Sequence, residues 1–217
     1  MAMEWLSPAD RAAFVRAVGS SDPGMIGNWA DSIRTVRAET KPWHFVDIPR
    51  TAKTFDAARD CPGQCLLSAL EMQIARATAG NVNVSIQREA LLFAVHLVED
   101  LHQPFHCYDD HDAGGNAVAV WYHGMPQNLH ALWDDLLVPG PISIDRRQHP
   151  SLSVRRSDLL GWINASHRLS QRAWLRPSSV VSEEYLRWGR RMVRRQCQLA
   201  ARRTAAVLHQ ILTVRAR

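Results

Sequence analysis

The chain has 217 residues, the length of a single domain, and 46% of them are hydrophobic, which excludes an intrinsically disordered protein. The longest apolar stretch, residues 90–98, is too short to span a bilayer and contains His96. The net charge of +5 weakly favours a polyanionic partner. The arginine-rich segments late in the chain are, however, more typical of the solvated face of a helix.

Hydrophobic periodicity and helix-start signals predict an all-α fold made of one helical domain over residues 1–217. The first helix is expected to begin at Pro8, with Ser7 as its N-cap. The segment 41–49 is bounded by two prolines and is predicted to be an extended connector. In the first half of the chain, helices are expected at 8–18, 23–36, 62–79 and 85–102, the last of them stopped by Pro104.

The second half of the chain is predicted to hold the only sheet structure. A short hairpin is expected near 116–123, with Gly114 and Gly115 supplying the turn. A compact helix over 126–137, with Asn128 as its candidate N-cap, and two long helices over 150–173 and 181–213 complete the prediction. Three tryptophans that could stack on a ligand are expected in the core instead: Trp43, Trp121 and Trp133.

The four cysteines and the first residues leave the cellular compartment open. If all four cysteines are bridged, three pairings are possible, and the sequence does not choose among them. Their spacing contains no CxxC zinc knuckle. No signal peptide is visible in MAMEWLSPAD, so either the protein stays inside the cell or the start shown is not the natural one.

The segment HLVEDLHQPFH concentrates potential metal ligands. His96 and Asp100 are four residues apart on a predicted helix and therefore project from one face. His130 and Asp134 repeat this spacing, and His106 follows the turn at Pro104. Imidazole nitrogen with carboxylate oxygen suits zinc at catalytic sites. One such pair is more often a surface ion pair, but two pairs together with His106 favour metal binding.

Two upstream residues, Asp31 and His44, are weak candidates for metal ligands when each is considered alone. The order of the motifs along the chain strengthens both assignments. The sequence reads WAD-x-I-R, WHFVDIP, H-x3-D-x-HQP-x-H, GGN and then NLH-x2-WD. This order resembles the zinc-dependent, single-strand-specific nucleases of the S-one/P-one type, over about residues 5–213. The helical fold of that family is similar to the fold of bacterial zinc phospholipase C.

The resemblance implies a ligand for zinc at each of seven positions. The first zinc is expected to bind Asp31, His44, His96 and Asp100, and the second His106, His130 and Asp134. The remaining histidines near the motif are given no ligand role: His102 is expected to be structural, and His111 and His123 to be solvated. Glu99, which precedes Asp100, is given no role either.

The family holds a third zinc with the amino group and carbonyl of an N-terminal tryptophan and with a nearby histidine. Here Trp5 is not terminal, and no histidine occurs before His44. We therefore expect this chain to encode two of the three zinc sites and to lack the N-terminal helix of the family. An upstream start with a leader is favoured over a truncated relative, and that leader would make the protein secreted or periplasmic.

The resemblance also implies a reaction and a substrate. The expected activity is endonucleolytic hydrolysis of single-stranded DNA and RNA by a zinc-bound hydroxide, which leaves 5′-phosphate products. Asp31 is expected to orient the nucleophile and Arg34 to offset charge on the scissile phosphate. Phe45 is expected to stack on a base, Asp47 to read its edge, and Asn116 to contact substrate. A monomer is expected.

Two other interpretations remain open at this point. One is a phosphodiesterase similar to zinc phospholipase C, although the HQP-x-H and WHFVDIP segments favour the nuclease. The other is a truncated relative that binds zinc or nucleic acid without turnover.

Overall fold

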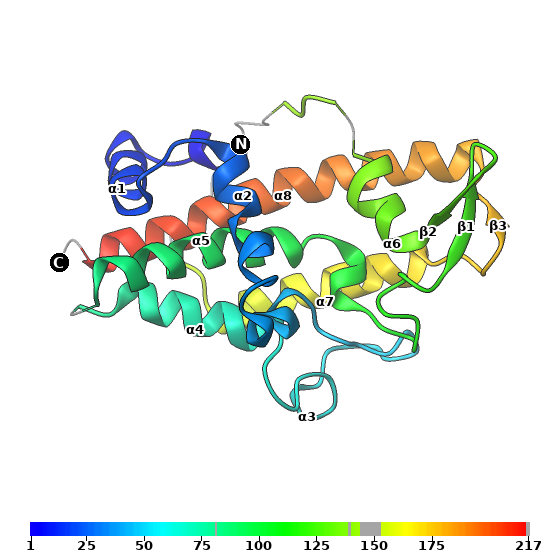
Figure 1. The fold of residues 1–217 in the computed structure, drawn as a ribbon, viewed down its shortest axis with the longest axis horizontal. Coiled ribbons are helices and arrows are strands. Elements are labelled where there is room, and N and C mark those ends of the chain that lie inside the picture. Colours follow the sequence, from blue (N-terminus) through cyan, green and yellow to red (C-terminus); the bar gives the residue numbers. More distant parts are fainter. Residues whose placement is uncertain (81, 139, 144–152, 216–217) are drawn as a thin grey trace.

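The computed structural model describes residues 1–80, 82–138, 140–143 and 153–215, which form a bundle of helices with one small sheet (Figure 1). Helix α5 (Val84–Asp100) lies in the middle of this bundle and packs against α1, α2, α4 and α8. Its residues 90–98 are all buried, as expected for a helix that is apolar on every side. The predicted all-α fold is confirmed.

The other elements surround α5 and build the two ends of the bundle. In chain order, the helical elements besides α5 are η1 (Ala2–Glu4), α1 (Pro8–Val18), α2 (Pro23–Ile33), η2 (Ala38–His44), α3 (Ala57–Asp60), α4 (Leu66–Thr78), η3 (Pro104–Cys107), α6 (Leu129–Ala131), η4 (Leu132–Leu136), α7 (Arg156–Ala173) and α8 (Glu183–Arg215). The strands are β1 (Ala119–Tyr122), β2 (Met125–Asn128) and β3 (Ser179–Val180).

The two predicted N-caps are confirmed. Ser7 accepts a hydrogen bond from the backbone N–H of Asp10 at the start of α1, and Asn128 accepts one from Ala131 at the start of α6. The predicted helix over 126–137 begins later than expected because residues 126–128 belong to β2, and it continues as the π-helical turn η4. The first of the two long closing helices begins at Arg156, and residues 150–152 lie outside the described part.

Helix α5 ends earlier than the predicted 85–102 range, at Asp100. The ring of Pro104 would clash with the carbonyl of Asp100 in a continuous helix, so the proline acts four residues upstream of its own position. Pro104 itself opens the short helix η3. The break between α5 and η3 turns the chain and brings His106 back toward α5.

The sheet has the strand order β2-β1-β3, and β1 pairs antiparallel with β2. The turn of this hairpin is His123-Gly124, not the Gly114-Gly115 pair expected from sequence, and the hairpin covers 119–128 rather than 116–123. His123 and Gly124 both have positive φ, of 47° and 78°, as a two-residue type I′ turn requires.

The predicted extended connector over 41–49 is wrong in its first half. Residues 38–44 form the 3₁₀ helix η2, and the chain becomes extended only at Phe45. The φ angle near −65° that a proline imposes also belongs to the 3₁₀ helix, which explains why Pro42 is tolerated inside η2. The extended residues then contact η3, where the N–H of Val46 donates to the carbonyl of His106.

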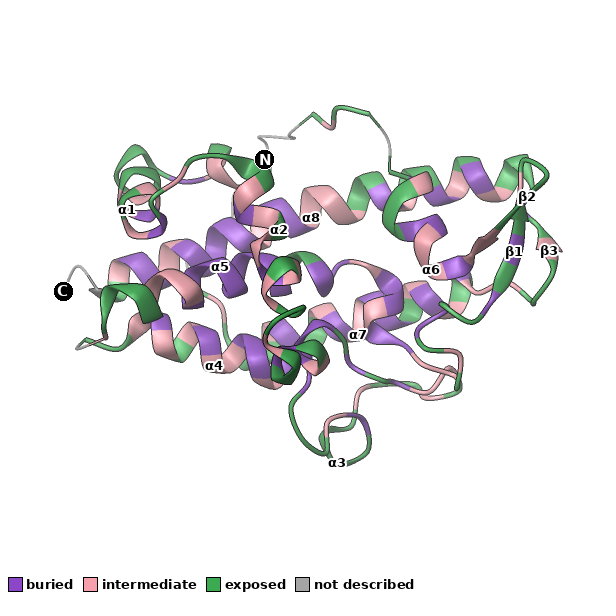
Figure 2. Ribbon diagram, viewed as in Figure 1, coloured by how far each residue is buried: buried purple, intermediate pink, exposed green. Residues whose placement is uncertain are grey.

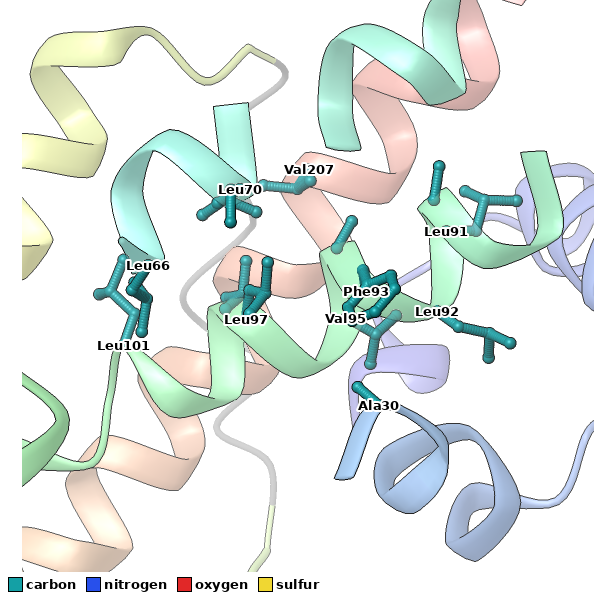
Figure 3. Close-up of a cluster of buried hydrophobic side chains, with 14 of the residues drawn as sticks. Ala30, Leu66, Leu70, Leu91, Leu92, Phe93, Val95, Leu97, Leu101 and Val207 are labelled. Atoms are coloured by element: carbon teal, nitrogen blue, oxygen red, sulfur yellow. The ribbon is translucent and has the colours of Figure 1, made fainter. Parts of the chain in front are cut away.

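The buried side chains form two hydrophobic clusters, and η3 contributes Cys107 to one and Phe105 to the other. Figure 2 marks the buried residues along the ribbon. The larger cluster surrounds α5 and includes Leu91, Phe93 and Leu97 (Figure 3). The smaller cluster lies under the sheet and around Trp133, and it includes Phe105 of η3. Trp43 and Trp133 are buried as predicted, but Trp121 is exposed, because β1 presents it on the outer face of the sheet.

Cys61 and Cys65 form a disulfide, whereas Cys107 and Cys197 are free thiols. The sequence left this pairing open. The loop closed by the disulfide precedes α4, which begins at Leu66 rather than near residue 62. Among the helices of the described residues, none combines the length and the apolar character needed to cross a bilayer.

Candidate metal centre

A cleft of about 870 Å³ lies where α2, η2, the end of α5, η3 and α6 meet. It is lined by nearly all the residues predicted for the site: Asp31, Arg34, His44, Phe45, Asp47, Asp100, His106, Asn116, His130 and Asp134. His96 is almost wholly buried and contacts three of them, Asp31, His44 and Asp100. The structure therefore brings residues that are up to a hundred positions apart into one place.

Four of these residues form what we call the inner cluster, which consists of Asp31, His44, His96 and Asp100. Nδ1 of His44 lies 3.0 Å from Nε2 of His96 and 2.9 Å from Oδ2 of Asp100. Oδ2 of Asp100 is also 3.1 Å from Nε2 of His96, as the i, i+4 spacing on α5 predicts. Oδ1 of Asp31 approaches the two imidazole nitrogens to 3.8 and 3.6 Å from the side of the cleft.

The other three ligand candidates form the outer cluster, which consists of His106, His130 and Asp134. Their potential ligand atoms all lie within 4.8 Å of one another. Nε2 of His130 is 3.1 Å from Oδ2 of Asp134, and the rings of His106 and His130 are stacked with their centroids 5.0 Å apart. Asp100 joins the two clusters, because its Oδ1 lies 3.4 Å from Nδ1 of His106.

Backbone carbonyls orient three of the four imidazole rings. Nδ1 of His96 bonds the carbonyl of Gly27, Nδ1 of His106 that of His44, and Nδ1 of His130 that of Gly114, each at 2.7 Å. A ring whose Nδ1 donates its proton in this way presents the Nε2 lone pair on its other side. Histidine ligands of metals are held in the same manner, so these rings are fixed for coordination.

Gly114 is needed for one of these contacts. It has a φ of +61°, and a Cβ added there would lie 2.8 Å from the carbonyl oxygen of Phe105. The loop can therefore approach η3 closely only with glycine at this position. That approach is what places the Gly114 carbonyl against His130.

In each cluster, a carboxylate and an imidazole stabilise each other's charged form and shift each other's pKa. Although burial opposes protonation, the Asp100 carboxylate raises the pKa of His96 to about 9. Burial likewise opposes ionisation of Asp100, yet His96 and then His106 hold the pKa of Asp100 well below its usual range. In the outer cluster, burial also opposes ionisation of Asp134, but the hydrogen bond with His130 holds the pKa of this carboxyl below its ordinary value.

The donor set fits divalent zinc. Nitrogen lone pairs and carboxylate oxygens repel one another at about 3 Å unless a proton or a metal cation lies between them. Nε2 of His44 is, in addition, buried and without a hydrogen-bond partner among the described residues. Imidazole and carboxylate from separate helices of a bundle are the materials from which such metal centres are built.

The predicted substrate residues lie around the clusters. Arg34 caps the end of α2, and its guanidinium lies 3.3 Å from Oδ1 of Asp31. Phe45 is 40% exposed, so the face of its ring is accessible in the cleft. Partial burial, with a smaller contribution from Asp109, raises the pKa of Asp47 to about 6. The side chain of Asn116 donates to the carbonyl of Ala113 at the cleft margin.

The three histidines that were given no ligand role, His102, His111 and His123, lie outside the two clusters. His102 is buried, donates through Nδ1 to the carbonyl of Val98, and receives a hydrogen bond from Arg203. Burial, followed by the charge of Arg203, lowers the pKa of His102 to about 3, so this ring is neutral and structural. His111 and His123 are exposed in loops.

Sequence reasoning assigned no role to Gln103, although it belongs to the HQP motif. The structure places its side chain in the cleft, where Nε2 donates to Oδ1 of Asp134 at 2.7 Å. The only sequence signal was its position between two candidate ligands, Asp100 and His106. The sequence also did not predict that the carbonyls of Gly27 and Gly114 orient His96 and His130, because every residue has a backbone carbonyl.

Comparison with known proteins agrees with this geometry. The family described as S1/P1 Nuclease matches residues 1–158, which include all seven ligand candidates. The chain is 36% identical to Nuclease S1 of Aspergillus oryzae over 115 residues, which are 50% of this chain and 39% of that protein. It is 32% identical to Nuclease P1 of Penicillium citrinum over 143 residues, or 62% of this chain and 53% of the relative.

A plant protein is also similar to part of this chain. Endonuclease 3 of Arabidopsis thaliana is 31% identical over 120 residues, which cover 51% of this chain and 40% of the relative. The chain thus spans about half the length of these curated relatives, or less. Because the family match covers well over half of the sequence, the chain belongs to the S1/P1 nuclease family.

Proposed function

We propose that this protein is a zinc-dependent endonuclease that hydrolyses single-stranded DNA and RNA and leaves 5′-phosphate ends. The observation that carries the proposal is the convergence of both clusters on one cleft in a member of a nuclease family. When bound, zinc supplies Lewis-acid activation of a phosphoryl oxygen and lowers the pKa of water from near 16 to about 7. The inner and outer clusters would each hold one ion.

The side chains around the clusters are suited to bind and orient a phosphodiester. Arg34 is held beside the inner cluster by Asp31, so its planar guanidinium can bind a phosphate placed at the cleft floor. Asp31 is half exposed and can accept a proton or orient a water molecule facing that phosphate. Asp47 and Asn116 lie within reach of a base or sugar that enters the cleft.

A preference for single strands follows from the position of Phe45. Its exposed ring can stack on a base, which contributes about 1–3 kcal/mol per base without requiring a particular sequence. A base in a duplex is already stacked and paired, so it has to leave the helix before it can reach this ring.

The same proposal extends to the assembly and the compartment. Every ligand candidate of both clusters comes from one chain, so a monomer is sufficient. The disulfide between Cys61 and Cys65 is typical of proteins that fold in an oxidising environment. We therefore propose that the protein acts as a monomer in the periplasm or outside the cell.

The test offers the zinc-loaded protein four substrates: single-stranded DNA, the same sequence as a duplex, single-stranded RNA and a chromogenic phosphocholine ester. We expect cleavage of both single strands, much slower cleavage of the duplex and products that carry a 5′-phosphate. Preference for the phosphocholine ester would assign the chain to a phospholipase-like activity. Zinc bound at both clusters without turnover of any substrate would instead indicate a binding protein.

Phe45→Ala tests the stacking step separately. We expect an increase in KM for single-stranded DNA of about tenfold, within the range that loss of one stacked base allows. Trp121→Ala is the matched control, because Trp121 is an equally exposed aromatic that lies on β1 outside the cleft. Equal effects of the two substitutions would exclude a specific role for Phe45.

A further inference from the structure

Gln103 connects two separate elements that supply ligands of the outer cluster. It is the N-cap of η3, the short helix that carries His106, and its Oε1 accepts the backbone N–H of Phe105. At the other end of the same amide, Nε2 donates to Oδ1 of Asp134, which lies thirty-one residues further along the chain. The backbone carbonyl of Gln103 also accepts the N–H of His106.

The orientation of this amide is determined by its surroundings. A backbone N–H can only donate, so the atom facing Phe105 has to be the amide oxygen. The amide nitrogen consequently faces Asp134, where it can only donate. With Oδ1 of Asp134 held in this way, Oδ2 is directed toward Nε2 of His130 and the centre of the outer cluster.

The hydrogen bond from Gln103 to Asp134 differs from the hydrogen bonds that orient the histidines of the two clusters. Three of their rings are oriented by backbone carbonyls, which no side-chain substitution removes. Asp134 is the most exposed member of the outer cluster, with 37% of its side chain accessible, and its contact with His130 is made within the cluster itself. Among the described contacts from outside the cluster, the one that holds Asp134 comes from a replaceable side chain, that of Gln103.

We propose that Gln103 is a positioning residue for the outer metal site, which sets the geometry of Asp134 and His106 without touching the metal itself. This inference rests on the proposed function, since it assumes that the outer cluster binds zinc. Loss of partners that orient metal ligands typically costs 10- to 100-fold in metal affinity. The expected effect is local, because Gln103 contacts no histidine or aspartate side chain of the inner cluster.

Gln103→Ser separates the two contacts of this residue. Serine is a good N-cap and can accept the N–H of Phe105, but it is too short to reach Asp134. Gln103→Met keeps the length of the side chain and removes both contacts. Gln73→Met is the matched control, because Gln73 is a buried glutamine of α4 that lines neither the cleft nor the outer cluster.

The experiment titrates zinc into the full chain by calorimetry, with His130→Ala used to identify the binding step that belongs to the outer cluster. We expect Gln103→Ser to weaken that step by about 10- to 100-fold and to leave the inner step and the metal-free melting temperature nearly unchanged. Gln103→Met should weaken it at least as much, and Gln73→Met should not affect it.

Three outcomes would overturn the proposal. Unchanged outer affinity in Gln103→Ser, in a chain whose wild type binds two ions, refutes the role of Gln103 and leaves the proposed function intact. Equal weakening of both steps shows a general structural effect. A wild-type chain that binds no zinc refutes this inference and the proposed function together.

Discussion

The inner and outer clusters use the same ligand types in different surroundings. In the inner cluster, the side chains of His44, His96 and Asp100 are 2%, 8% and 10% exposed, and Asp31 alone, at 43%, faces the open cleft. In the outer cluster, the side chains of His106, His130 and Asp134 are 14%, 17% and 37% exposed. The inner site is therefore held by packing and buried charge, whereas the outer site depends on the hydrogen bonds that orient each ligand.

This difference has an energetic consequence. A buried ionised group that loses its partner costs about 3–5 kcal/mol, because its charge is left without compensation. A partly exposed pair contributes much less, since water can replace the lost partner. Substitutions in the inner cluster should thus affect metal binding and folding together, and substitutions in the outer cluster mainly metal binding.

The largest effect is expected from Asp100→Asn. The Asp100 carboxylate contacts His44 and His96 and also approaches His106, so both clusters lose negative charge at once. Zinc affinity of the inner cluster should fall by at least about 100-fold, and nuclease activity should become undetectable. Asp110→Asn is the control, because Asp110 pairs with Arg50 away from the clusters. Full activity in the Asp100→Asn variant would contradict the bridging role.

His96→Ala is expected to abolish activity and the inner zinc while the outer zinc remains. The imidazole is one of two that approach Asp100 within the inner cluster, so the variant loses one of the two nitrogen donors of this site. Zinc content per chain and cleavage of single-stranded DNA are the measurements. His123→Ala, in an exposed loop, should change neither of them. Retention of activity without the inner zinc would show that the outer cluster suffices.

Removal of zinc should lower the melting temperature by a moderate amount. A ligand at a hundred times its Kd stabilises the folded state by about 2.7 kcal/mol, which corresponds to roughly 5–10 °C for a chain of this size. Thermal melts with and without chelator measure the effect. His96→Ala should lose more of this stabilisation than His130→Ala, since the inner cluster is the more buried. A larger loss of stabilisation in His130→Ala than in His96→Ala would contradict the view that the inner cluster is the more tightly built site.

The smallest effect is expected from Asp47→Asn. The pKa of Asp47 is about 6 in the folded protein against 3.8 ordinarily, so the folded state binds more protons between these values. The wild type therefore loses stability as the pH rises from about 4 to 6, and the asparagine variant does not. Because Asp47 is exposed, solvent screening reduces this effect, and the melting temperature of Asp47→Asn relative to the wild type should rise by only about 1–2 °C across that window and then stay level. A difference in melting temperature between the variant and the wild type that is the same at all pH values would contradict the raised pKa of Asp47.

Local geometry explains which parts of the site were predictable. The pairs His96/Asp100 and His130/Asp134 follow from the spacing of a helical turn, and the structure shows contacts of 3.1 Å in both. The N-caps Ser7 and Asn128 are also local, because a cap bonds a residue three positions away. That Asp31 and His44 join His96 was expected only from the resemblance, since no local rule links them.

The features that were missed depend on contacts between distant segments. The bond from Gln103 to Asp134 spans thirty-one residues, and two of the three carbonyls that orient the histidines belong to glycines, Gly27 and Gly114. The hairpin turn was misplaced because Gly114 and Gly115 have positive φ for another reason, the close approach to η3. Trp121 was assigned to the core because tryptophan is usually buried, but the outer face of the small sheet exposes it.

The number of zinc ions bound per chain tests directly whether each cluster is a metal site. Elemental analysis of the purified chain, together with His96→Ala and His130→Ala, counts the ions that each cluster holds. We expect two zinc ions in the wild type and one in each variant, with the inner ion lost in His96→Ala and the outer ion in His130→Ala. A wild type that binds no zinc, or two variants that both keep two ions, would contradict this expectation.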